Sequence, residues 1–573
     1  MKTAMRNATK PAKDIHVDIP KEIAMSRMKL VMAAAIAAVA VQLLCVHSAN
    51  AATDDIAPKP PIKAGAKGVS PDDAAPRTAM VVQDNVAMRA AAKDSSPAQA
   101  QLWRGEALEI RGERPDHFQV YDYRRERGGF VRKSALLPLG GAAGQPESLL
   151  AALRVVRQQP GMESLGVGLA AAYVQAASVA QINGVDGAEA LDAMGTLAER
   201  LAERASRVAP RADGAATAAT AAETQVAAQL DVAARYGLRF RTLEREAGAL
   251  QLCYDGEAFR RVLAMPVASA EQKARAALAL TRVDCLDPTA TPPQREQMDQ
   301  WRADVLDKVD LRDPLLTTYW RNRVLMRQTG VWSSLAFIRA RRASAGALPA
   351  GTPGQLQVDA AGAASRRALE AFARVVPTEL SDDDQPAYND AAMRGNATRW
   401  LAMPAGPSEQ TLGGFKLTIA SGQPGETCVT LALNGAREGS AAQLRHCAWG
   451  LVMPASARIN REGNAITVAS VPADGWRELW VLRRTAQGWR VTVLPPVAAQ
   501  PGLGYAEFAG WVPGGKELLV ARESRAEGRY KRSYELVDLD TLETKRQAGD
   551  VTMLGAFQRW QAADWKGTSL SLR

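Results

Sequence analysis

The spacing of apolar residues changes twice along this 573-residue chain, and no other feature limits its fold as strongly. Short apolar runs separated by polar and Gly/Pro turns occupy residues 79–140, a helical period covers 146–402, and strict alternation prevails in 411–573. Strands repeat every two residues and helices every 3.6, so one pattern cannot serve both. We therefore predict a multidomain α+β protein: a small β domain, an α-helical middle and a mainly antiparallel C-terminal β domain.

Residues 25–51 have the pattern of an export signal. A short basic start precedes an apolar run from Leu30 to Leu44, and Ala49-Asn50-Ala51 supplies the small residues of a cleavage site. Cleavage after Ala51 would deliver the protein to the periplasm without a membrane span. An uncleaved anchor is the alternative, because the apolar run approaches the roughly 20 residues that a bilayer requires.

The segments around this signal carry little folding information. Residues 1–24 form an upstream extension, so either Met1 or Met25 can be the true start. Residues 52–78 are rich in Pro, Ala, Gly and charge, which predicts a flexible linker. Removal of residues 1–51 lowers the formal net charge from +10 to +6. No dense basic stripe with interleaved aromatics remains, which disfavours a nucleic-acid partner.

Four cysteines follow the cleavage site: Cys253, Cys285, Cys428 and Cys447. An even number in an oxidising compartment favours disulfides, and the spacing lacks the close Cys pairs and nearby His of a zinc site. Cys428 and Cys447 are nearly equidistant from a turn near Arg437, which predicts a bridge between neighbouring strands. No metal is expected.

The helical region contains one readable pair of elements. Residues 249–264 predict one helix, which Pro266 ends, and Ser269-x-x-Gln272 is a capping box for a second helix ending near Asp284. A connection this short makes an antiparallel hairpin, and Cys253 and Cys285 would bridge its open end.

The remaining helical pattern is irregular. Residues 343–362 are rich in Gly, Ala and Pro and predict a linker or surface loop. Successive hairpins suggest a helical solenoid, loosely similar in architecture to tetratricopeptide-type arrays. An apolar stripe on one further helix is formed by Leu191, Met194, Ala198, Leu201, Ala205 and Val208.

Five short motifs occur in order within residues 79–140. They are Val86-Ala87-Met88-Arg89, Leu102-Trp103-Arg104-Gly105-Glu106, Phe118-Gln119-Val120, Gly129-Phe130-Val131 and Leu136-Leu137. Together they resemble a bacterial SH3-like (SH3b) domain over its whole length, with Phe in two positions where that family has Trp. The resemblance implies a small β-barrel whose natural ligand is peptidoglycan or an envelope protein.

The candidate ligand-binding residues of this domain cluster near one strand. Tyr121 and Tyr123 share a strand face and lie beside Arg124 and Arg125, and Trp103 is a further aromatic candidate. Aromatic side chains and guanidinium groups are typical of binding surfaces. For Trp103 the alternative is packing in the core of the small barrel.

The C-terminal region reads as strands and contains a repeat. Residues 415–419 and 427–433 alternate in polarity, and Asn434-Gly435 predicts the turn that follows. Residues 462–469 parallel residues 514–521. The segment from Ala509 to Leu518 resembles a blade segment of TolB-type β-propellers, which implies a propeller-like domain; a β-sandwich is the alternative.

Residues typical of catalysis are scarce. Only His117 and His446 follow the cleavage site, and no serine-hydrolase, zinc-protease or phosphate-loop motif occurs. The acidic run at residues 382–384 is interpreted as a solvated helix-capping or loop segment. We expect no cofactor and predict an exported, non-enzymatic envelope binding or scaffold protein. The alternatives are a carboxylate-based peptidoglycan hydrolase and a structural subunit of an envelope complex.

Overall fold

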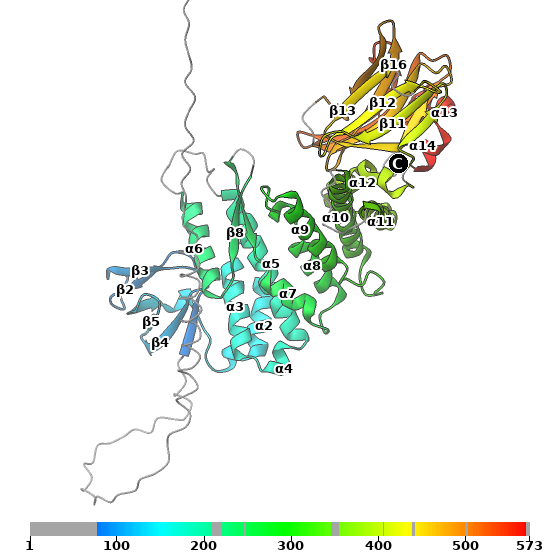
Figure 1. Cartoon of the computed structure of the whole chain (residues 1–573). Coiled ribbons are helices and arrows are strands. Elements are labelled where there is room, and N and C mark those ends of the chain that lie inside the picture. Colours follow the sequence, from blue (N-terminus) through cyan, green and yellow to red (C-terminus); the bar gives the residue numbers. More distant parts are fainter. Residues whose placement is uncertain are drawn as a thin grey trace, which may run out of the picture. The chain divides into compact units, whose positions relative to one another are not determined.

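The structure is a computed structural model that describes residues 77–208, 220–245, 248–344, 354–404, 406–437, 442–498 and 502–568. The predicted signal, its cleavage site and nearly all of the 52–78 linker lie outside these residues. In chain order an N-terminal β-sheet, a helical middle and C-terminal antiparallel sheets follow one another (Figure 1). The predicted mixed α+β organisation is confirmed. Among the described residues, no helix combines the length and apolar character needed to cross a bilayer.

Seven short strands form the N-terminal sheet, in the order β3-β2-β6-β5-β4-β1-β7 with antiparallel neighbours. Alternation explains its core: in β4 every second residue from Leu108 to Ile110 is buried, together with Phe118 and Val120 of β5. The strands are β1 Arg77–Val81, β2 Val86–Arg89, β3 Ala98–Leu102, β4 Ala107–Glu113, β5 His117–Asp122, β6 Arg127–Arg132 and β7 Leu136–Pro138.

The helical middle follows. Its helices are α2 Pro146–Val156, α3 Glu163–Ala176, α4 Val179–Ile182, α5 Val185–Val208, α6 Ala221–Arg235, α7 Glu257–Ala264, α8 Ala270–Leu280, α9 Pro292–Leu306, α10 Thr318–Ser344, α11 Gly354–Ala373 and α12 Gln385–Thr398. The predicted apolar stripe lies on α5, where Leu191, Leu201 and Ala205 are buried. A second core joins α8, α9, α10 and α11 through residues such as Ala274, Leu306 and Leu335.

The predicted helix over residues 249–264 is wrong in its first part. Leu250–Tyr254 is a strand, β9, paired antiparallel with β8 (Phe240–Glu244), and α7 begins only at Glu257. Gly256 precedes α7 with φ of +84°, a left-handed conformation that interrupts any helix and suits glycine. The second half of the prediction is confirmed, because Ser269 and Gln272 form the capping box of α8.

Two loop predictions also need correction. The predicted 343–362 linker is shorter, since α10 continues through Ser344 and α11 starts at Gly354; the Ala-rich sequence of this segment favours helix.

The acidic run at 382–384 is not wholly solvated. Asp384 is buried and its Oδ1 lies 2.7 Å from Nε of Arg323, because α10 brings that guanidinium against the short 3₁₀ turn.

The C-terminal region contains two sheets, which are antiparallel except where β18 pairs parallel with β16. Four strands pair in the order β10-β11-β12-β13, and an eight-stranded sheet runs β14-β15-β16-β18-β19-β20-β21 with β17 beside β16. The strands are β10 Glu409–Leu412, β11 Phe415–Ser421, β12 Thr427–Leu433, β13 Leu444–Ala448, β14 Leu451–Ile459, β15 Ala465–Ala473, β16 Trp476–Thr485, β17 Gly488–Leu494, β18 Leu503–Val512, β19 Glu517–Ala526, β20 Arg529–Asp538 and β21 Thr544–Ala548, followed by α13 Gly555–Trp560 and α14 Ala563–Thr568.

The two sheets share one hydrophobic core. Leu417 and Val429 of the smaller sheet pack in the same cluster as Ile466 and Trp480 of the larger one. The two copies of the sequence repeat are the β15–β16 and β19–β20 hairpins, and both lie in the eight-stranded sheet. They are linked by β18, which pairs parallel with β16 and antiparallel with β19.

A buried ion-pair group joins the helical middle to this sheet. Glu507 of β18 contacts the guanidinium of Arg399, which follows α12, and lies 3.4 Å from that of Arg477 of β16. Nη1 of Arg477 also donates to the carbonyl of Asn396 at 2.5 Å. All three charged side chains are at most 5% exposed. Burial lowers the pKa of Arg399 to about 10.

The four cysteines form the two predicted pairs. Cys253 of β9 is bonded to Cys285, which lies in the 3₁₀ turn after α8, so the bridge ties a strand to the end of a helix. Cys428 and Cys447 stand opposite each other in β12 and β13 and are also bonded.

Replacing both Cys253 and Cys285 by serine should lower the free energy of unfolding by roughly 3–4 kcal/mol, because the bridge closes a loop whose ends are 32 residues apart. Guanidinium denaturation of the oxidised protein measures the change. The Cys428/Cys447 double serine variant is the comparison, with a shorter span of 19 residues and an expected loss of about 3 kcal/mol. Unchanged denaturation midpoints in both variants would contradict the expectation.

Candidate functional site

The predicted aromatic ligand residues form a small exposed patch at the end of β5. The rings of Tyr121 and Tyr123 meet edge to face with centroids 5.0 Å apart, and the guanidinium of Arg111 lies 3.7 Å from the centroid of Tyr121. The hydroxyl of Tyr123 donates to Glu109 at 2.9 Å, and Arg111 donates to the same carboxylate oxygen at 2.8 Å. We call these four residues the tyrosine patch. Tyr123 is 68% exposed.

The patch is held together by strand register. Glu109 pairs opposite Tyr121 in the β4–β5 ladder, and the register shifts between Ile110 and Gly112, so that Arg111 lies at a bulge beside this pair. The hydrogen bonds from Tyr123 and Arg111 hold the pKa of Glu109 below its usual range. Glu109 and Arg111 were not predicted from sequence. Their place in the strand Ala107–Glu113 could be predicted, but their contact with Tyr121 and Tyr123 depends on the pairing of β4 with β5.

Arg124 and Arg125, predicted as ligand residues, instead make contacts within the protein. Nη1 of Arg124 lies 2.6 Å from Asp231 of α6. Nη1 of Arg125 lies 2.9 Å from Glu106 and also contacts Asp122. Trp103 is half-buried in the turn between β3 and β4. The structure therefore brings together Tyr121 and Tyr123 but directs the two arginines elsewhere.

Glu106 is the centre of the contact between the N-terminal sheet and α6. Glu106 is 2% exposed, and its carboxylate accepts hydrogen bonds from Arg125 on both oxygens, at 2.9 and 3.1 Å, and from Arg235 of α6 on Oε1 at 3.0 Å. Burial raises the pKa of Glu106, and the hydrogen bond from Arg125 opposes this rise. Beside it, the Tyr236 hydroxyl donates to the Gly105 carbonyl at 2.6 Å. Burial raises the pKa of Tyr236 to about 12.

Gly105 shows how closely the two regions approach. Its φ is +90°, and a Cβ at this position would lie 2.5 Å from the carbonyl oxygen of Ser164 in α3. Asp84 adds to the same contact by accepting hydrogen bonds from the side-chain amides of Gln225 and Gln229 on α6. The Leu-x-x-Gly-Glu turn of the sequence motif is therefore the part of the sheet that docks on the helices.

A large cavity lies between the helical middle and β19 of the C-terminal sheet and was not predicted. It has a volume of about 780 Å³ and is lined by eight arginines and five carboxylates, together with Trp320 and a few apolar side chains. The arginines are Arg275, Arg282, Arg295, Arg302, Arg323, Arg327, Arg394 and Arg525; the carboxylates are Glu199, Glu203, Asp284, Asp384 and Asp390. We call this the arginine cavity.

Each carboxylate of the arginine cavity is already ion-paired. Arg282 alone contacts Glu199, Glu203 and Asp284, and the other two acids pair with Arg323 and Arg525. Glu199 also lines an adjoining cavity of about 410 Å³. Burial raises the pKa of Glu199 in spite of Arg282. Among the described residues, the wall of the arginine cavity therefore has no unpaired carboxylate, and arginines are its most numerous charged side chains.

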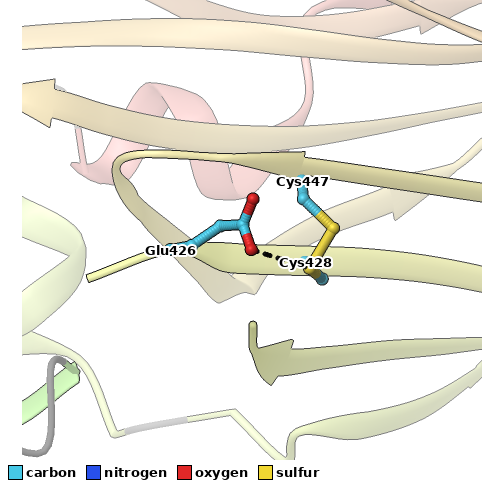
Figure 2. Close-up of side chains that lie close together, drawn as sticks. All are labelled: Glu426, Cys428 and Cys447. Carbon is cyan, nitrogen blue, oxygen red and sulfur yellow. Dashed lines mark hydrogen bonds between the residues drawn. A yellow bond between two sulfur atoms is a disulfide. The ribbon is translucent and has the colours of Figure 1, made fainter. Parts of the chain in front are cut away.

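The metal-like cluster of the C-terminal sheet is explained by a disulfide. Glu426, Cys428 and Cys447 place their oxygen and sulfur atoms within 4.8 Å of one another, and they are the one His/Cys/acid group of this size among the described residues (Figure 2). The two sulfurs are bonded to each other, whereas metal binding requires thiolates. This group therefore has no thiolate ligand to offer.

Comparisons of the chain with protein-family models, with curated proteins and with solved structures gave no significant match. The SH3b and propeller resemblances accordingly remain predictions.

Replacing Arg235 by methionine should loosen the N-terminal sheet from α6, because Glu106 would keep only one of its two guanidinium partners while staying buried. We expect local opening around Gly105 and Glu106 to become easier by about 1–3 kcal/mol. Amide hydrogen exchange of the β3–β4 turn measures this. Arg239→Met is the matched control, because that side chain is 82% exposed. Equal exchange in the two variants would contradict the role given to Arg235.

Proposed function

We propose that this protein is an exported, non-enzymatic component of the cell envelope whose N-terminal β domain is an SH3-like module. In this proposal the module contacts peptidoglycan or an envelope protein through the tyrosine patch. The observation that carries it is the surface cluster in which Arg111 lies over the ring of Tyr121 and this ring meets that of Tyr123 edge to face. The two disulfides agree with folding in an oxidising compartment such as the periplasm.

The chemistry of the patch suits a glycopeptide surface. Aromatic rings pack against the C–H faces of sugar rings, and a guanidinium stacked on a ring can turn its N–H groups to peptide carbonyls or carboxylates. Glu109 balances the charge of Arg111, so the patch is close to neutral and would not rely on long-range attraction. Phosphate-rich polymers are therefore less suitable ligands than glycan and peptide.

The rest of the chain is proposed to act as a scaffold. Contacts of Glu106, Asp84 and Arg124 with α6 support a module fixed on the helical middle rather than one on a free tether. The helical middle would be an irregular solenoid. For the C-terminal domain, the core shared by its two sheets supports the sandwich alternative over a propeller, because both repeat copies belong to one sheet.

A peptidoglycan hydrolase remains the second candidate. Glu199, with its raised pKa, opens on two cavities and is the best-placed general acid of the helical middle. A glycosidase also needs a second carboxylate available as base or nucleophile. The acids lining the arginine cavity are all ion-paired, which supports binding over hydrolysis.

A pull-down with purified peptidoglycan sacculi tests the proposed function. Tyr121→Ala/Tyr123→Ala and Arg111→Ala should each reduce the bound fraction of the full-length protein at least fivefold, since they remove the stacked surface. Arg114→Ala is the control: it removes an equal charge from an exposed turn of the same sheet. If wild-type protein does not bind sacculi, or if the Arg114 variant loses as much as the Arg111 variant, recognition of peptidoglycan by the patch is refuted.

The same incubation separates the two candidates. A binding protein leaves the sacculi intact, whereas a hydrolase releases soluble muropeptides that chromatography detects. Release that persists in the tyrosine double variant and disappears in Glu199→Gln would favour the hydrolase.

A further inference from the structure

Arg327 of α10 is the one arginine of the arginine cavity without a carboxylate partner among the described residues. The other seven each form an ion pair, with Asp192, Asp299 and Asp474 contributing from behind the cavity wall. Nη1 of Arg327 donates to the Leu278 carbonyl at 3.2 Å and to the Thr281 hydroxyl at 3.4 Å. Within the described part of the chain, its Nε and Nη2 donate to no acceptor.

A structural role accounts for only one nitrogen of this side chain. Leu278 and Thr281 lie at the C-terminal end of α8, where a cation favourably meets the helix dipole. One N–H group pointing at these acceptors is enough for that purpose. The edge formed by Nε and Nη2 is the edge with which arginine binds carboxylates and phosphates in a bidentate way, and here that edge is unused.

Positive charge is concentrated around Arg327. Arg302 also contacts the C-terminal end of α8, because its Nη2 donates to the carbonyl of Thr281 at 2.8 Å. Arg295 and Arg302 share a single carboxylate, that of Asp299, at 2.8 and 2.6 Å. Burial, and then the charge of Arg302, lower the pKa of Arg327 to about 10, so it remains protonated at neutral pH. Arg327 is half-buried, and Asp284 and Glu199 attract its charge only from beyond ion-pair distance, so an anion in the cavity would give it a direct partner.

The shape of the cavity indicates a small ligand. A volume of about 780 Å³ lies within the range of small-molecule sites. Trp320 forms one wall, and its ring is flanked by the guanidinium groups of Arg275 at 5.1 Å and Arg323 at 5.7 Å. A ligand whose anionic end reaches Arg327 could rest its remaining atoms against this ring and the neighbouring Met326.

We propose that the arginine cavity binds a small molecule through an oxyanion group, a carboxylate or a phosphate, that accepts two hydrogen bonds from Nε and Nη2 of Arg327. This site is distinct from the tyrosine patch and does not depend on the function proposed for it. An anion fits the cavity better than a cation, because Arg327 has no ion-pair partner among the described residues whereas every carboxylate on the wall has one.

Titration calorimetry and thermal denaturation of the full-length protein test the proposal. The probes are inorganic phosphate and pyrophosphate in one arm and citrate in the other, each against sodium chloride at equal ionic strength. We expect at least one probe to bind and to raise the melting temperature above the chloride control. The arm that binds more tightly identifies the oxyanion as phosphate or carboxylate.

Two arginine variants make the test specific. Arg327→Met should weaken binding at least tenfold, as expected for the loss of charge-assisted hydrogen bonds. Arg312→Met, which removes an exposed arginine outside the cavity, should bind like the wild type. Arg327→Lys keeps the charge but not the fork, and it should fold and bind with intermediate affinity even if the methionine variant does not fold.

The proposal is overturned by any of three results. Neither arm exceeds the chloride control, or the Arg327 variants bind as tightly as the wild type, or Arg312→Met loses as much affinity as Arg327→Met.

Discussion

A buried glutamate held between two arginines closes each junction of the helical middle with a β domain. At the N-terminal side Glu106 lies between Arg125 of its own sheet and Arg235 of α6. At the C-terminal side Glu507 lies between Arg477 of its own sheet and Arg399 beside α12. Burial of a carboxylate costs its hydration free energy, and the ion pairs offset this cost only when both guanidinium groups are in place. Each glutamate is therefore favourably buried only when the β domain is docked on the helical middle.

The docking contacts of the N-terminal sheet also determine where the tyrosine patch lies on the protein surface. The strand that carries Tyr121 continues into the loop that carries Arg124 and Arg125, and both arginines are committed to the docked face. The two tyrosines precede these arginines in sequence, but their contacts are with Glu109 and Arg111 of β4. One short segment thus serves docking and exposure at once, and the docking contacts fix the position of the exposed surface.

The sequence predicted what depends on local pattern and missed what depends on distant partners. The stripe on α5, the Ser269 capping box and the opposed pair Cys428/Cys447 follow from spacing alone. The sequence favours a helix over Leu250–Tyr254, because the apolar residues of this segment fit a helical period as well as a strand period. Its identity as strand β9 comes from pairing with β8. The ion pair of Arg124 could not be predicted from a local pattern, because its partner, Asp231, is 107 positions away in sequence.

The arginine cavity shows the same limit more strongly. Ion pairs such as Arg275 with Asp192 join residues 83 positions apart, so no local reading could tell a neutralised guanidinium from an available one. Helix α5 relates this cavity to the N-terminal module: Glu199 and Glu203 line the cavity, while Arg204 contacts Gln229 of α6, which holds Asp84. An anion that draws on Arg282 would compete with the two glutamates of α5. This competition could affect the docked N-terminal sheet only by way of α5 and α6, and only if the anion binds one arrangement of these helices more tightly than another.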